Sequence, residues 1–225
     1  MSKKSDRMIK RFGLQFRIAH WLTAFSFIAL YITALPMYTE FFDWLYPVLG
    51  GPANARFLHR VFGIMFMLPF FFLIFTDPKA LLHWIKSCFT WKKHDFQFLL
   101  AFPLVFFGKN KDYPKQDFYN GGEKVNSLLQ MVSAVAIIFS GIIIWNTGWF
   151  PNWLVDIGYL VHAAGVGLAA AVVLAHAYLG TFGPDGWKAF RGMTKGDVPE
   201  DWAEHHHGRW YDEVKEKEKN SKKGA

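Results

Sequence analysis

Four long stretches of the chain are apolar and free of Asp, Glu, Lys and Arg, while the charged residues are crowded between them. Three of these stretches reach the length of about 20 residues with which a helix crosses a bilayer core. The remaining one reaches it if its helix begins ahead of Arg56 and Arg60. Backbone polar groups must find partners within lipid, so the pattern predicts four membrane-spanning helices. Their expected bounds are about 15–38, 54–76, 124–146 and 154–182.

The segments between the spans predict interfacial helices on one side of an all-α, integral membrane four-helix bundle. Residues 80–91, early in the connection 77–123, mix apolar and basic residues as a helix in the membrane interface does. Residues 96–107 are apolar but too few to span, and Pro103 interrupts them, so they predict a re-entrant or interfacial segment. The polar residues 108–122 predict a loop.

The chain divides into a four-span domain, 1–182, and a C-terminal extension, 183–225. The extension balances acidic against basic residues and contains three tryptophans, which predicts a surface helix that frays beyond about Lys215. Its three consecutive histidines, 205–207, favour a solvated polar turn, with metal binding as the alternative. No internal repeat or second folded domain is apparent.

The basic residues predict the orientation in the membrane. All of the 25 Lys and Arg except Arg56 and Arg60 lie before or in the first turn of the first span, after the fourth span, or from the end of the second span to the start of the third. Cytoplasmic segments carry such an excess, so both termini are expected in the cytoplasm. The net charge of +7 then reflects topology and attraction to anionic lipid, and calls for no nucleic acid. The first apolar run is too long for a signal-peptide core and is interpreted as an uncleaved span.

Four of the nine histidines lie in or at the mouth of the spans, where an ionisable side chain indicates function. His20 and His176 are expected near the cytoplasmic surface, and His59 and His162 near the periplasmic surface. On one helix, the fourteen residues from His162 to His176 place both rings on the same side, about 21 Å apart. We interpret the four as axial ligands of two haem b irons, paired His20/His176 and His59/His162. Helix–helix hydrogen bonding and a proton relay are the alternatives.

Two imidazoles on each iron leave no coordination position for a substrate, so this interpretation predicts electron transfer and no catalytic residue. Arg60 is a candidate partner for a haem propionate, with snorkelling to the interface as the alternative. The single cysteine, Cys88, excludes an internal disulfide, covalent haem attachment through CxxCH and an all-Cys iron–sulfur cluster. Small residues near His162 and His176 would admit a flat macrocycle or, alternatively, allow close helix packing. They are Gly158, Gly165, Ala169 and Gly180.

Polar residues at the start of the third span are candidates for a quinone pocket next to the cytoplasmic histidines. Asn126, Gln130 and Ser133 share roughly one face of the expected helix. For each of them, hydrogen bonding between helices is the favoured alternative.

Several stretches resemble the cytochrome b (gamma) subunit of the respiratory formate dehydrogenases, and the likeness runs nearly end to end. The stretches are His20-Trp21, Leu58-His59 with Phe62-Gly63, Tyr119-Asn120-Gly121-Gly122 with Lys124, 141–145, 162–165 with His176, and 202–211. The resemblance implies a bacterial inner-membrane protein of anaerobic respiration. It also implies as partners an iron–sulfur subunit and a molybdopterin or tungstopterin catalytic subunit on the periplasmic face, in a higher oligomer of the heterotrimer.

The resemblance further implies that electrons enter at the His59/His162 haem, pass to the His20/His176 haem and reduce menaquinone or another quinone. In that family the residues matching Asn120, Gly122 and His176 contact the quinone. This sequence departs from the family where Arg60 replaces a frequent Pro and Glu123 replaces a frequent Gln. Glu123 is therefore a candidate for assisting quinone protonation.

Two alternatives stay open on the sequence alone. The first is the equivalent dihaem subunit of a hydrogenase or of a thiosulfate or polysulfide reductase, since relatives that serve those enzymes share the four-span plan. The second, of another class, is a haem-free membrane anchor or a transporter that uses the histidines as a proton relay.

Overall fold

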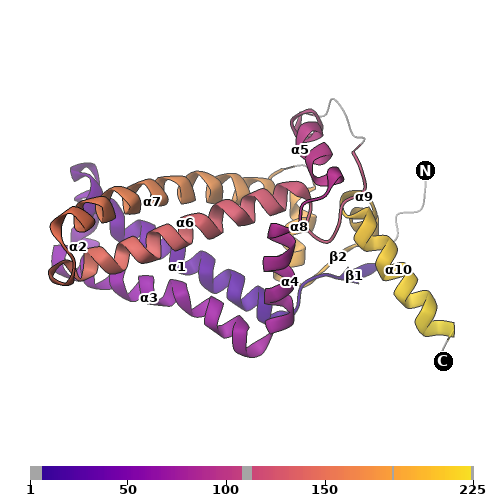
Figure 1. Cartoon of the computed structure of the whole chain (residues 1–225), viewed down its shortest axis with the longest axis horizontal. Helices are drawn as coiled ribbons and strands as arrows, with labels where there is room; N and C mark the ends of the chain where they lie inside the picture. Colours follow the sequence, from indigo (N-terminus) through magenta and orange to yellow (C-terminus); the bar gives the residue numbers. More distant parts are fainter. Residues whose placement is uncertain (1–6, 108–112, 184, 224–225) are drawn as a thin grey trace. The chain divides into compact units, whose positions relative to one another are not determined.

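The structure is a computed structural model that describes residues 7–107, 113–183 and 185–223. Four of its helices are long and apolar enough to cross a membrane, and each begins and ends within three residues of the expected bounds (Figure 1). The all-α, four-span architecture is therefore confirmed. The helices are α1 (Leu14–Tyr38), α3 (Pro52–Thr76), α6 (Gly121–Trp145) and α7 (Asn152–Thr181).

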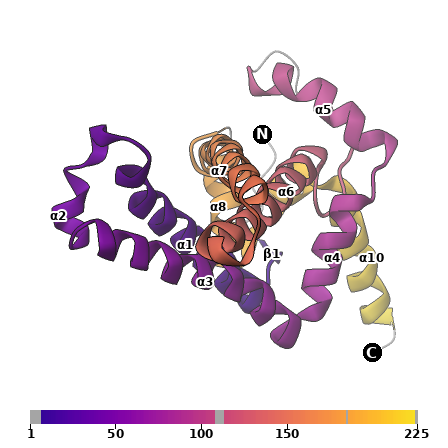
Figure 2. The same ribbon diagram turned by 60° about the vertical axis from the view of Figure 1, so that its left-hand side comes forward.

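The chain forms two compact units, each built on one antiparallel pair of long helices. The hairpin unit is Phe12–His83, in which α1 packs on α3, and the C-terminal unit is the remainder, in which α6 packs on α7 (Figure 2). Short helical elements connect the members of each pair. They are η1 (Glu40–Phe42) and α2 (Leu45–Leu49) in the hairpin unit, and η2 (Thr147–Trp149) in the C-terminal unit.

Local sequence chemistry sets the ends of the long helices. Gly50 and Gly51 have φ angles of 78° and 93°, which only glycine adopts readily, and they turn the chain into Pro52 at the first position of α3. α6 begins in a capping box: the Asn120 side chain accepts from the Glu123 N–H at 2.9 Å, and the Glu123 carboxylate accepts from the Asn120 N–H at 3.0 Å. This box starts α6 three residues earlier than expected.

The connection between α3 and α6 carries two shorter helices, α4 (Pro78–Phe89) and α5 (Lys93–Phe106). Both fall where the sequence predicted interfacial segments, and α5 continues through Pro103. The described part of the predicted loop, 113–120, contains neither helix nor strand, while its other residues, 108–112, lie outside the described residues.

The C-terminal extension folds onto the N-terminal segment through a strand pair that was not expected. β1 (Met8–Lys10) pairs antiparallel with β2 (Asp197–Pro199), with Ile9 opposite Val198. Ile9 and Val198 are buried with Trp202, Ala203 and Trp210 in one apolar cluster. The extension further forms α8 (Gly186–Thr194), α9 (Glu200–His206) and α10 (Gly208–Lys223), so helix continues past Lys215, where fraying was expected.

Candidate functional site

His59, in the second turn of α3, contacts a buried hydroxyl of α1. The Oγ1 of Thr33 lies 3.0 Å from His59 Nδ1, and Thr33 is 1% exposed. The Thr33 hydroxyl has one proton, and two acceptors of its own helix, Ala29 O at 2.9 Å and Leu30 O at 3.0 Å, are in reach of it. A hydroxyl that donates to its own helix faces the imidazole with a lone pair, so Nδ1 carries the proton.

His162, in α7, repeats this arrangement against α6. Its Nδ1 lies 3.1 Å from Ser140 Oγ and 3.2 Å from the carbonyl oxygen of Ile137. A carbonyl oxygen only accepts, so here too Nδ1 is the protonated nitrogen. In this tautomer Nε2 is the nitrogen with an available lone pair, as a neutral imidazole needs to bind a metal. The residues present therefore fit the haem interpretation at both histidines.

Each unit holds two imidazoles at nearly the same separation along its helices. In the hairpin unit, His59 lies beside Thr33 of α1, because the two side chains are in contact. Thr33 is thirteen residues, or about 20 Å along α1, from His20. In the C-terminal unit, His162 and His176 are fourteen residues or about 21 Å apart along α7. The members of each predicted pair belong to different units, so the pairing itself stays a prediction.

The remaining two histidines have different surroundings. His176 Nδ1 lies 3.4 Å from the Asn126 side-chain amide of α6, a group that has both a donor and an acceptor. Gln130 in turn donates to the Asn126 oxygen at 3.2 Å. The His20 ring stands edge-on to Trp21, with centroids 5.1 Å apart. Arg60, in α3 directly after His59, is exposed, and its role toward a propionate stays a prediction.

Two of the small residues near His162 fit the helix-packing alternative rather than a macrocycle slot. A methyl group on Gly165 would lie 3.0 Å from Ile137, and one on Gly158 would lie 3.2 Å from Ile143, both in α6. Ser133 is also buried, and its hydroxyl donates to Leu129 of its own helix at 2.8 Å. The Ser133 hydroxyl is thus bonded within α6, which is neither a quinone contact nor the hydrogen bond between helices that was the favoured alternative.

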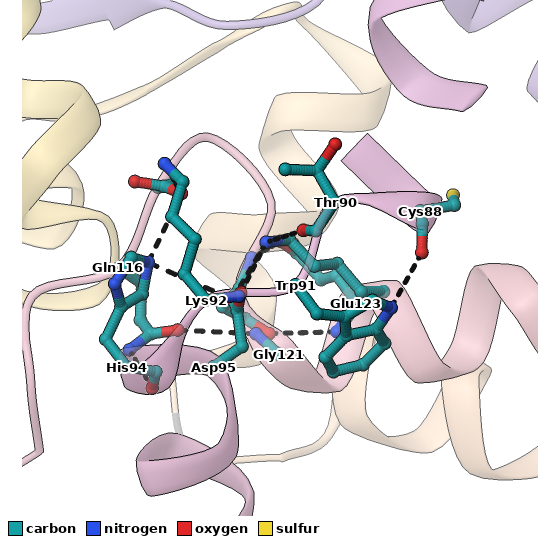
Figure 3. A network of polar contacts seen from close by, with 12 residues as sticks. Cys88, Thr90, Trp91, Lys92, His94, Asp95, Gln116, Gly121 and Glu123 are labelled. Atoms are coloured by element: carbon teal, nitrogen blue, oxygen red, sulfur yellow. Dashed lines mark hydrogen bonds and ion pairs between the residues drawn. The ribbon is translucent and has the colours of Figure 1, made fainter. Parts of the chain in front are cut away.

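The start of α6 is fixed by a polar network in which the backbone and side chain of Asp95 take part (Figure 3). Lys124 Nζ lies 2.8 Å from Asp95 Oδ2 and donates to Thr90 O at 3.1 Å. Asp95 also accepts from the Lys92 N–H at 2.8 Å, which caps α5. A methyl group on Gly121 would lie 2.5 Å from Asp95 O, so only glycine fits there. Within the motif 119–124, Gly121 and Lys124 thus have structural roles.

Glu123, a predicted quinone residue, pairs with Arg11 of the N-terminal segment. Arg11 Nη2 donates to the two Glu123 oxygens at 3.0 and 3.2 Å, and to Phe118 O at 2.9 Å. The guanidinium also lies 5.1 Å from the ring centroid of Trp202. Asn120 is occupied as the N-cap, and a methyl group on Gly122 would meet Asn120 Oδ1 at 3.3 Å. The contact of Asn120, Gly122 and Glu123 with quinone stays a prediction.

The interpretation of the three histidines as a solvated turn is wrong for His207. His207 is 1% exposed, because its ring packs against Trp202 and Trp210. Its Nδ1 donates to Asp117 O at 2.9 Å. Burial, and then the positive charge of Arg11, lower the pKa of His207 to about 3. Among the described residues no group of three or more His, Cys, Asp or Glu is arranged to hold a metal ion.

A shallow apolar groove lies between α5 and α7. Phe102, Ala175, Tyr178 and Leu179 line it. Ala175 directly precedes His176, so the groove lies at the end of α7 that carries His176.

Sequence analysis did not identify Thr33 and Ser140 as hydrogen-bond partners of the histidines, although their positions in the sequence could have indicated it. Each is a hydroxyl residue within an apolar span, five residues before the last residue of its helix. The histidine that it contacts lies on the following span, which returns through the membrane at the same end of the pair.

Comparisons with known proteins all find cytochrome b proteins that resemble this chain. The family model described as prokaryotic cytochrome b561 matches residues 11–196. The cytochrome b556(Fdn) subunit of the nitrate-inducible formate dehydrogenase of Escherichia coli K12 is 30% identical over the full length of both chains. The formate dehydrogenase cytochrome b556 subunit of Haemophilus influenzae is 29% identical over 93% of this chain and 84% of its own. The cytochrome b556(fdo) subunit of Escherichia coli K12 is 25% identical over 95% and 96%.

Proposed function

This chain belongs to the prokaryotic cytochrome b561 family, and we propose from this that it carries electrons through two haem b groups between a formate dehydrogenase module and quinone. Four apolar helices and this family make it a multi-pass membrane protein, and the family implies haem b. Its relatives are named as cytochrome b subunits of formate dehydrogenases, which implies a catalytic partner. The number of haems, the quinone and the direction are the proposal.

The matched spacing of the imidazoles supports two haems rather than one. The hairpin unit offers imidazoles about 20 Å apart along its helices, and the C-terminal unit offers them about 21 Å apart. Equal spacings allow His59 with His162, and His20 with His176, to serve one iron each at two depths. A proton relay would need no such match between separate helix pairs.

The protein's own residues hold and orient the ligands in this proposal. Thr33 and Ser140 accept hydrogen bonds from the Nδ1–H groups of His59 and His162, so the proton stays on Nδ1 and Nε2 of each ring would be available to bind iron. Haem b, when bound, supplies a one-electron iron couple. Arg60 is proposed to pair with a propionate near His59.

The quinone is proposed to bind at the end of the helices that carries His176. The amide of Asn126 next to His176, and the apolar groove that Ala175 helps to line, support this position. Asn120, Gly122 and Glu123, at the start of α6, are proposed to complete the site, and menaquinone is the expected acceptor. His176 is proposed to bind the iron as well as to contact the quinone.

The partners and the orientation complete the proposal. An iron–sulfur subunit and a molybdopterin or tungstopterin subunit are proposed on the periplasmic side, with the heterotrimer assembled into a higher oligomer. The chain is proposed to lie in the bacterial inner membrane with both termini in the cytoplasm, which the distribution of Lys and Arg supports.

The test uses the complex purified with its native partners. Formate is expected to reduce b-type haem in absorption difference spectra, and an added menaquinone analogue is expected to reoxidise it. His162→Ala and His20→Ala are each expected to lose one of the two haems, while His205→Ala, an exposed histidine, keeps both. Partners that oxidise hydrogen but not formate, or difference spectra without b-type bands, would contradict the proposal.

A further inference from the structure

We propose that Thr33 and Ser140 are positioning residues that make the axial imidazoles of His59 and His162 more electron-rich. This inference rests on the proposed function, because it concerns histidines that are proposed to bind iron. It assigns to the two hydroxyls a role in setting the potential of the haem held by His59 and His162.

The direction of each hydrogen bond is fixed by the other contacts of the hydroxyl. Thr33 Oγ1 lies 2.9 Å from Ala29 O, and Ser140 Oγ lies 2.6 Å from Ala136 O, and neither carbonyl can donate. Each hydroxyl therefore spends its only proton within its own helix and presents a lone pair to the facing ring. The Nδ1–H groups of His59 and His162 donate to these lone pairs at 3.0 and 3.1 Å.

Burial strengthens both contacts. Thr33 is 1% exposed and Ser140 is 3% exposed, so water does not compete for either hydroxyl. Gly141, next to Ser140, leaves the space that the His162 ring fills, since a methyl group there would lie 3.3 Å from His162 Cε1. The ring of His162 is thus held both by its hydrogen bonds and by shape.

The hydrogen bonds that the two hydroxyls accept change the ligand strength of the facing imidazoles. Donation from Nδ1–H to a fixed acceptor raises the basicity of Nε2, which favours oxidised over reduced iron. The two hydroxyls should therefore lower the midpoint potential of the His59/His162 haem below the value that it has without them.

The experiment removes each hydroxyl from the complete complex while keeping the shape of the side chain. Thr33→Val is expected to raise the midpoint potential of the haem that His162→Ala removes, and to leave the other potential unchanged. Ser140→Ala is expected to raise the same potential by less, because Ile137 O, 3.2 Å from His162 Nδ1, still accepts its proton. Thr33→Ser and Ser140→Thr keep a hydroxyl and are expected to restore the original value. Ser133→Ala is the matched control, because it removes an equally buried hydroxyl that donates to Leu129 instead.

Spectroelectrochemical titration of both haems, together with haem content per chain, gives the readout. Loss of that one haem in Ser140→Ala, with recovery in Ser140→Thr, would also support the assignment. An unchanged potential in Thr33→Val, or an equal shift in Ser133→Ala, would overturn it. A wild-type chain without haem would instead refute the proposed function, so the two failures are distinguishable.

Discussion

Lys124→Met removes the cation from a buried ion pair whose partner cannot reach solvent. The side chains of Asp95 and Lys124 are 0% and 3% exposed, and their charged atoms are 2.8 Å apart. Without Lys124, the Asp95 carboxylate keeps the Lys92 N–H at 2.8 Å but loses its closest counter-charge, since His94 Nε2 lies 4.0 Å away. Breaking a buried pair on one side costs about 3–5 kcal/mol. For a chain of this size, that lowers the unfolding midpoint temperature by roughly 6–20 °C.

The matched control is an exposed pair in the same unit. Lys115 and Asp212 approach to 2.7 Å, but their side chains are 60% and 55% exposed. Solvent screening limits the effect of Lys115→Met to about 0–1 kcal/mol. The double variant Asp95→Asn with Lys124→Met removes both charges and is expected to recover much of the loss.

The assay is thermal unfolding of the purified protein in detergent, followed by circular dichroism for all four proteins. Equal midpoints for Lys124→Met and Lys115→Met would refute the reasoning, as would a double variant less stable than Lys124→Met alone. Either result would mean that the pair is not buried as the structure shows.

Three further substitutions test the packing around this network. In His207→Gln the unfolding midpoint should depend less on pH between about 3 and 6.5. Because burial lowers the pKa of His207 in the folded protein to about 3, the unfolded chain binds this proton at a higher pH than the folded chain does. The free energy of unfolding of the wild type therefore falls by about 1.4 kcal/mol for each pH unit as the pH drops through that window. Unchanged pH dependence in the variant would contradict the burial of this ring. Gly121→Ala should destabilise by about 1–3 kcal/mol, since its methyl group would lie 2.5 Å from Asp95 O, whereas Gly167→Ala has open space and should be neutral or stabilising in the same unfolding assay. Glu123→Gln should lower the free energy of unfolding by about 1.5–3 kcal/mol, because it weakens the charged hydrogen bonds of buried Arg11. Glu218→Gln should have almost no effect, since its partner Arg7 is exposed. Equal unfolding midpoints for the two variants would argue against the Arg11 contact.

The four spans were predictable because their signal is local. A charge-free apolar run of sufficient length determines a membrane helix without information from the rest of the chain. The start of α6 was placed three residues late, because Gly121 and Gly122 are weak helix formers and the capping box of Asn120 with Glu123 outweighed them.

The contacts that the sequence did not predict join residues far apart in the chain. The pairing of β1 with β2 involves three residues on each side and has no periodicity to detect. His207 looked like part of a polar run, but its Nδ1 donates to Asp117 O, ninety residues earlier in the chain. Likewise, Glu123 was a candidate because it departs from the family that the sequence resembles. In the structure it forms an ion pair with Arg11, which lies far from it in the sequence.

The histidines show how much of the site the sequence could predict. Membrane depth and spacing identified His20, His59, His162 and His176 as candidates. The tautomers of His59 and His162 required the hydroxyls on neighbouring helices, and these contacts come from packing alone.

Haem content per chain tests the central claim most directly. We expect two haem b groups for each copy of this chain in the purified complex, measured as the pyridine haemochrome against protein concentration. We expect one in His162→Ala. A wild-type ratio of one or zero, or a ratio of two that survives in His162→Ala, would contradict the assignment of two imidazole pairs at two depths.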